Sequence, residues 1–144
     1  MMISVRLILG AAAAVASTLV LAQSTLGELV DSGAKRMTKD QLESSLGGTK
    51  FTGGLRSGRA TLNIELKADG TIAGSVTAQG HSAGTLGKWA VDETGKTCID
   101  VRISTWNVTD KGCVFYYRLG EASYRTLNES EDRGTQMVKY VFAN

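Results

Sequence analysis

The sequence predicts a small, mainly β domain: an antiparallel meander of about eight strands, closed as a barrel or folded as a sandwich, with one short N-terminal helix. Three observations predict this class. Apolar and polar residues alternate over short segments after residue 49, polar or glycine-rich turns separate those segments, and no second helical block follows. Short strands at regular spacing are typical of small barrels and sandwiches.

The chain begins with an apolar leader over residues 1–22, which the sequence predicts to be a cleavable signal peptide. Arg6 provides the positive start, an uncharged run rich in Ala and Leu begins at Leu7, and small residues precede a cut after Ala22. A transmembrane anchor is the alternative, because the uncharged stretch is long enough to span a bilayer, but polar residues dilute it. We therefore expect export to the periplasm or outside the cell, with no transmembrane segment after cleavage.

The rest of the chain divides into a flexible N-terminal arm over residues 23–37, which is weakly patterned, and a single domain over 38–144. The net charge is +2, and acidic and basic residues are interspersed without a basic stripe. This composition argues against nucleic acid or an anionic membrane as the partner, since both attract clustered positive charge.

The single predicted helix covers residues 39–46. Thr38 and Gln41 have the spacing of a capping box, in which each side chain accepts a hydrogen bond from the other's backbone. Leu42 and Leu46 lie four residues apart on one face, and Gly47 follows as a stop signal. We expect this helix to cover one end of the sheet.

The strands follow as short alternating segments after the helix. In residues 60–66 apolar and polar residues alternate without interruption, as a half-buried strand requires. Residues 79–85 and 105–112 are expected to be connections. The other expected strands are residues 71–77, 86–91, 97–103, 113–119, 122–127 and 136–142.

Cys98 and Cys113 are the only cysteines, and an even pair in a small exported domain predicts a disulfide. A hairpin that places these cysteines opposite each other also places Asp100 opposite Lys111. The disulfide then lies on the polar face, and Ile99, Val101 and Ile103 point to the core. The aromatic residues after Cys113 continue the disulfide's face, so either both faces are covered there or a bulge shifts the alternation.

Several short motifs occur in a distinctive order after the helix. They are Asp69-Gly70-Thr71-x-x-Gly74, Gly87-x-Trp89-x-Val91, Cys98, Cys113-x-Phe115-x-Tyr117-Arg118 and Gly134-Thr135. In this order the segment from Thr38 to Phe142 resembles a family of small exported bacterial proteins of unknown function, although the stretch between Cys98 and Trp106 is longer here. The resemblance implies an exported β domain with one disulfide, and it implies no activity.

Catalytic and metal-binding constellations are not evident. His81 is the only histidine, and it lies in an expected loop beside Ser82, without the orienting acid that a catalytic histidine needs. The carboxylates of the turns, such as Glu129 and Asp132, lack the spacing of a calcium loop. We therefore expect no enzyme activity, no cofactor and no metal.

The aromatic residues supply most of the expected core, with one candidate recognition surface. Tyr116 and Tyr117 are neighbours on a strand, so one of them is expected to face outward. Together with His81 and Trp106, it would recognise a partner.

The function expected from these features is that of an exported, non-catalytic binding protein whose surface contacts another protein or an envelope component. Two alternatives remain: a hollow barrel that carries a small apolar ligand, and an inhibitor of an extracytoplasmic enzyme with the N-terminal arm as the inserting segment. The supply of large apolar residues matches one filled core and favours the surface hypothesis over the carrier.

Overall fold

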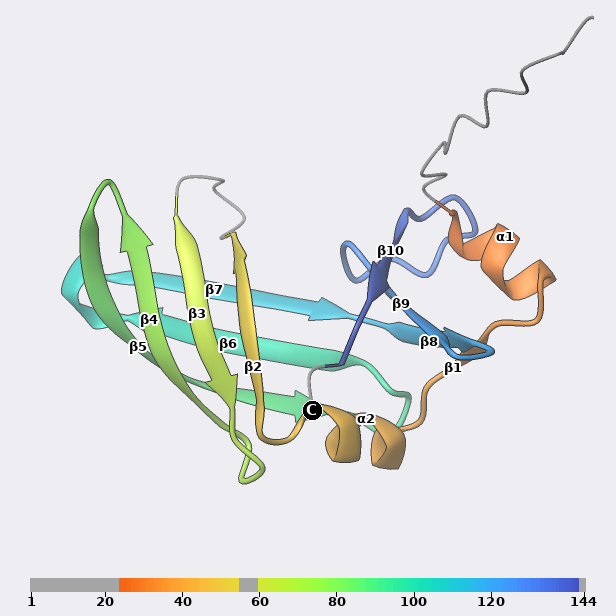
Figure 1. The fold of residues 1–144 in the computed structure, drawn as a ribbon, viewed down its shortest axis with the longest axis horizontal. Helices are drawn as coiled ribbons and strands as arrows, with labels where there is room; N and C mark the ends of the chain where they lie inside the picture. Colours follow the sequence, from red (N-terminus) through yellow and green to blue (C-terminus); the bar gives the residue numbers. More distant parts are fainter. Residues whose placement is uncertain (1–23, 55–59, 143–144) are drawn as a thin grey trace, which may run out of the picture.

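The computed structural model describes residues 24–54 and 60–142, and these residues form ten strands in two antiparallel sheets (Figure 1). The larger sheet has six strands in chain order: β2 (Thr49–Gly54), β3 (Thr61–Leu66), β4 (Thr71–Ala78), β5 (His81–Val91), β6 (Thr97–Ile103) and β7 (Val108–Val114). The smaller sheet has the order β1 (Lys35–Arg36), β8 (Tyr116–Leu119), β9 (Ala122–Thr126) and β10 (Met137–Tyr140). The predicted mainly β class is confirmed, with ten strands in place of about eight.

The six-stranded sheet curls into a half-barrel whose two edges are β2 and β7 (Figure 1). Two glycines allow adjacent strands to approach closely in this curl. A Cβ atom on Gly74 would collide with the backbone of Asn63 in β3, and one on Gly87 would collide with the backbone of Asp100 in β6. Because β2 and β7 do not pair with each other, the half-barrel has an open side.

The turn between β3 and β4 is held by hydrogen bonds from within and from a neighbouring strand. Asp69 Oδ1 accepts from the backbone N of Thr71 at 2.9 Å, and Gly70 has a φ of 85°, which glycine adopts without strain. The indole Nε1 of Trp89, in β5, donates to the carbonyl of Lys67 at 2.8 Å. Trp89 thus fixes the turn and fills the core at the same time.

The predicted connections at residues 79–85 and 105–112 are wrong. Gln79 and Gly80 have φ values of 49° and 79°, so these two residues alone form the turn between β4 and β5. Positive φ at both positions gives a two-residue turn that matches the right-handed twist of a hairpin. Because the turn is this short, strand pairing extends into the glycine-rich segment. The second connection shortens to η1 (Ser104–Trp106) and Asn107, after which β7 begins.

The helix α2 (Lys39–Leu46) has the predicted bounds and cap. The backbone N of Gln41 donates to Thr38 Oγ1 at 3.3 Å, and the backbone N of Thr38 donates to Gln41 Oε1 at 3.0 Å. Leu42 and Leu46 are fully buried. The helix lies beside the lower ends of β2 and β3 (Figure 1), so its apolar face adds to the core of the half-barrel.

The expected flexible arm is wrong for the part of it that the structure describes. Thr25 and Glu28 form a second capping box, which begins the helix α1 (Leu26–Asp31). Leu26 and Leu29 are each only 4% exposed, and the backbone N of Leu26 donates to the carbonyl of Thr135 at 2.8 Å. The segment is therefore packed and paired with the C-terminal part of the chain.

Two apolar clusters lie on opposite sides of the chain where β7 continues into β8. Tyr116 belongs to the cluster inside the half-barrel, together with α2. Phe115 and Tyr117 belong to a second cluster with Leu26 and Leu29 of α1. Of the two explanations left open by the alternation after Cys113, coverage of both faces is the correct one, and α1 provides the second cover.

Candidate functional site

A groove of about 210 Å³ runs along the concave side of the half-barrel, between the edge strands β2 and β7. Its floor consists of apolar side chains from four strands: Phe51, Leu62, Ile64, Leu66, Ile99 and Val114. Its polar lining comes from five residues: Thr97, Asp110, Tyr116, Arg125 and Tyr140. The groove is thus an apolar trough with a small number of polar groups.

Strand alternation explains why these residues share one side. In β6, Thr97 and Ile99 point to the same face as the fully buried Val101, because successive side chains alternate across a strand. In β7, Val114 pairs with Thr97 and Gly112 pairs with Ile99. Gly112 lines the groove without a side chain, so it leaves space opposite Ile99.

The hydroxyl of Thr97 is the unusual polar group in this lining. Thr97 is 4% exposed, and its Oγ1 has no hydrogen-bond partner among the described residues. Buried polar groups in folded proteins are almost always paired, because an unpaired one costs free energy. Thr85 in β5 is the other buried threonine with an unpartnered hydroxyl, but it does not line the groove.

An aromatic cluster closes the groove at the end where β8 and β10 lie. The rings of Tyr116 and Tyr140 meet edge to face with centroids 5.2 Å apart, and Phe142 packs against both. Burial raises the pKa of Tyr116 and of Tyr140, while the positive charge of Arg125 opposes each rise. Arg125 therefore acts on both tyrosine hydroxyls at this end of the groove.

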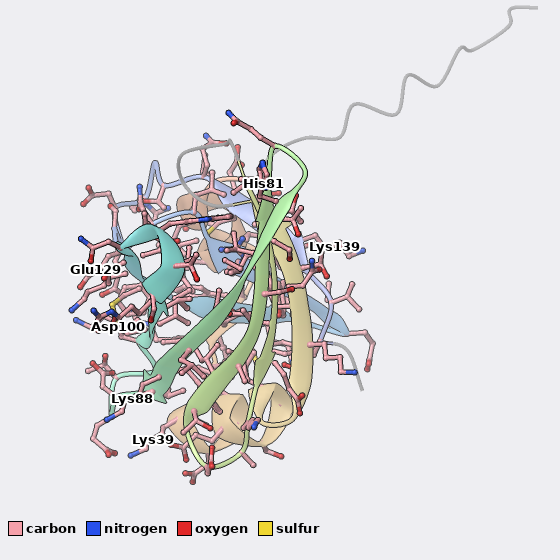
Figure 2. The ribbon with its side chains drawn as sticks, turned by 90° about the vertical axis from the view of Figure 1, so that its left-hand side faces the viewer. Lys39, His81, Lys88, Asp100, Glu129 and Lys139 are labelled. Carbon is pink, nitrogen blue, oxygen red and sulfur yellow. A yellow bond between two sulfur atoms is a disulfide. The ribbon has the colours of Figure 1, made fainter. Side chains whose placement is uncertain are left out.

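The residues predicted as a recognition surface are not brought together. Tyr116 and Tyr117 are each 6% exposed and face different clusters, so the expectation that one of them faces outward is wrong. Trp106 is half-buried and packs against the core of the half-barrel. His81 is exposed at the start of β5, and Figure 2 shows it at the opposite end of the molecule from Lys39.

Tyr117 has a structural role instead, through Arg36. The Nη2 of Arg36 donates to the hydroxyl of Tyr117 at 3.1 Å, and its guanidinium lies 4.5 Å from the centre of the Phe115 ring. Arg36 also forms an ion pair with Glu131. These contacts connect β1, β8 and the loop before β10. The hydroxyl of Tyr117 therefore forms a hydrogen bond inside the protein.

Cys98 and Cys113 pair directly across β6 and β7, at disulfide distance, with Cα atoms 4.0 Å apart. The register predicted from the cysteines is confirmed: Asp100 pairs with Lys111, and their side chains form an ion pair at 3.0 Å. The cysteine pair lies on the face opposite the groove, because Thr97 and Ile99 flank Cys98 and point the other way.

No group of three or more histidine, cysteine or acidic residues that could hold a metal occurs in the described part of the chain. The hydroxyl of Ser82, next to His81, lies 3.4 Å from the carbonyl of Val76 and 3.3 Å from Thr77 Oγ1. These contacts belong to the β4–β5 hairpin. None of the helices in residues 24–54 and 60–142 is long and apolar enough to cross a membrane.

Neither a family model, nor a curated protein, nor a solved structure matches this chain. The family resemblance of the segment from Thr38 to Phe142 therefore stays a prediction that rests on its motifs.

The groove was not among the sites predicted from the sequence, although one signal for it was present. Thr97 shares the alternation of Ile99, so it is a polar residue at a core-facing position. The roles of Arg125 and Tyr140 depend on the packing of the smaller sheet beside the larger one. No local pattern in the sequence marks that arrangement.

Proposed function

We propose that this protein is an exported, non-catalytic binding protein, and that the groove between β2 and β7 holds the apolar part of a small ligand. The observation that carries the proposal is the buried, unpartnered hydroxyl of Thr97 in an otherwise apolar floor. Ligand sites are typically apolar, with a few polar groups that orient the ligand. A ligand atom at Thr97 would provide the hydrogen bond that the protein does not.

This proposal moves the binding site from the outer surface to the concave side. The surface hypothesis depended on an outward tyrosine, and both Tyr116 and Tyr117 are buried. His81 and Trp106 remain as candidates for a surface site, but His81 is a single exposed side chain and Trp106 is half-buried and packs against the core. The carrier alternative is the better supported of the two, in the form of an open groove and not of a closed, hollow barrel.

The size of the groove limits the ligand. In another protein an engineered apolar cavity of about 150 Å³ binds benzene. The groove, at about 210 Å³, therefore has room for one ring with a short substituent, or for a short alkyl chain. Sites for drug-sized molecules occupy roughly 300–1,000 Å³. A larger ligand would have to extend through the open side.

Export is the second part of the proposal. The predicted leader, residues 1–22, lies outside the described residues and supports export through its sequence pattern alone. The cysteine pair at disulfide distance adds support, since disulfides persist in oxidising compartments.

A matched pair of substitutions tests the binding site. Ile99→Phe places a larger side chain in the groove, whereas Leu86→Phe makes a similar change at a position that is 69% exposed and does not line the groove. The probe is 4-phenylbutan-1-ol, titrated into each purified protein and followed by two-dimensional NMR. We expect Ile99→Phe to weaken binding and Leu86→Phe to leave it unchanged. Absence of binding to the unaltered protein, or equal binding to both variants, would contradict the proposal.

A further inference from the structure

We infer that the ligand of this groove is a small amphipathic anion, whose acidic group is held by Arg125 and Tyr140 at the same end of the groove as Thr97, and whose apolar body lies on the floor. This inference rests on the proposed function and adds the chemical class of the ligand. It follows from the arrangement of polar groups at one end of the groove.

Arg125 and Tyr140 come from neighbouring strands of the smaller sheet and meet at the same end of the groove. β9 pairs with β8 on one side, where Arg125 is opposite Tyr116, and with β10 on the other, where Tyr140 is opposite Ser123. Arg125 is partly buried, and it lines the groove together with the hydroxyl-bearing rings of Tyr116 and Tyr140. A guanidinium and a phenol in this arrangement are hydrogen-bond donors to a carboxylate.

The described ion pairs do not use Arg125. The five cations in the described ion pairs are Arg36, Lys39, Lys96, Lys111 and Arg133. Beside an apolar floor, the attraction between Arg125 and an anion is stronger than in bulk water, because less solvent screens it. A ligand with a negative group at this end would therefore bind more tightly than a neutral ligand of the same shape.

The one acidic residue in the groove lining lies toward the other end. Asp110 precedes Val114 by four residues in β7, which corresponds to about 13 Å along a strand. The energy between two charges falls inversely with their separation, so at about 13 Å Asp110 acts on a bound anion about four times more weakly than Arg125 does at about 3 Å. Asp110 therefore does not cancel the positive charge at Arg125, and its own charge disfavours an acid bound at its end. The anion is thus directed toward β9 and β10.

Two probes with the same carbon skeleton test the inference: 4-phenylbutyrate, which is anionic, and 4-phenylbutan-1-ol, which is neutral. Each is titrated into the purified protein and into two variants, Arg125→Gln and Arg102→Gln. Arg102 is exposed and does not line the groove, so its variant makes the same change in net charge elsewhere. We expect the unaltered protein to bind the acid about tenfold more tightly than the alcohol, as a charged hydrogen bond implies.

Arg125→Gln should weaken binding of the acid about tenfold more than binding of the alcohol and so abolish this preference, whereas Arg102→Gln should keep it. A third variant, Arg125→Lys, retains the charge and is expected to keep part of the preference, which controls for misfolding of the glutamine variant. Equal binding of acid and alcohol would overturn the inference and leave the proposed function intact. Equal loss of both probes in Arg125→Gln would also overturn it. If neither probe bound the unaltered protein, the proposed function would be contradicted as well.

Discussion

Two buried threonines differ in whether their hydroxyl has a hydrogen-bond partner, and this difference predicts opposite effects of the same substitution. Thr97 Oγ1 has no partner among the described residues. Thr126, which is 0% exposed, accepts a hydrogen bond from the backbone N of Phe115 at 3.0 Å and donates one to the carbonyl of Asn128 at 2.6 Å. Valine has nearly the shape of threonine and a similar preference for strands, so each Thr→Val change chiefly replaces a hydroxyl with a methyl group.

The hydrogen bonds that each hydroxyl makes determine the expected change in the free energy of unfolding. Thr97→Val removes a buried hydroxyl whose desolvation no hydrogen bond offsets, so the free energy of unfolding should rise by about 1 kcal/mol. Thr126→Val removes two hydrogen bonds and leaves the Phe115 amide buried without an acceptor. The free energy of unfolding of this variant should therefore fall by about 3 kcal/mol. The difference of about 4 kcal/mol between the variants far exceeds the error of a denaturation experiment.

Urea denaturation of the oxidised protein, followed by circular dichroism in the far ultraviolet, measures both changes. The two variants should have the same slope against urea and midpoints on opposite sides of that of the unaltered protein. If Thr97→Val destabilised the protein by as much as Thr126→Val, the hydroxyl of Thr97 would have to be engaged within the fold. The proposed hydrogen bond between this hydroxyl and a ligand would then be refuted.

Three further predictions concern the disulfide, alkaline pH and the leader. Replacing both Cys98 and Cys113 by alanine should lower the free energy of unfolding by about 3 kcal/mol, as the chain-entropy relation gives for a loop of this length, with a fall in the thermal midpoint as the readout. Burial raises the pKa of Tyr116 above its ordinary value of about 10, so its contribution to stability is present below pH 10 and is lost as the pH rises further. Tyr116→Phe should therefore make the urea midpoint decline less steeply above pH 10, and an unchanged decline would count against this cause. Mass spectrometry of the native protein should find Gln23 at the N-terminus, following cleavage after Ala22, and an intact leader on exported protein would contradict the signal peptide.

The features that were predicted from the sequence are those whose signals are local. The capping box at Thr38 and the leucine pair of α2 are contained within nine residues, and the structure reproduces the helix with the same bounds. The register of β6 and β7 followed from Cys98 opposite Cys113, because one cross-strand pair determines all the others in a hairpin.

Two of the errors have one cause, the unrecognised helix α1. The capping box at Thr25 was equally visible in the sequence, but α1 has only six residues and its stability comes from tertiary packing of Leu26 and Leu29. The burial of both Tyr116 and Tyr117 depended on that same helix, since α1 covers the face that would otherwise be exposed. An unrecognised short helix therefore produced the wrong prediction of an outward tyrosine.

The groove itself could not be derived from strand patterns. Alternation predicts which side chains face a core, but it does not say whether the sheet closes around that core. Closure is decided by how far the whole sheet curls, and here β2 and β7 remain unpaired edges. The supply of large apolar residues was expected to match one filled core, but the open edge leaves part of it facing a groove.

Ligand-to-protein distances measured by NMR test the central claim most directly. The experiment uses isotopically labelled protein with 4-phenylbutyrate and records nuclear Overhauser effects between the phenyl ring and the protein's methyl groups. The groove predicts contacts from the ring to Ile64, Ile99 and Val114, which come from three different strands and meet only on the concave side. Contacts confined to residues outside the groove, such as Leu86 on β5 or Val30 on α1, would contradict it.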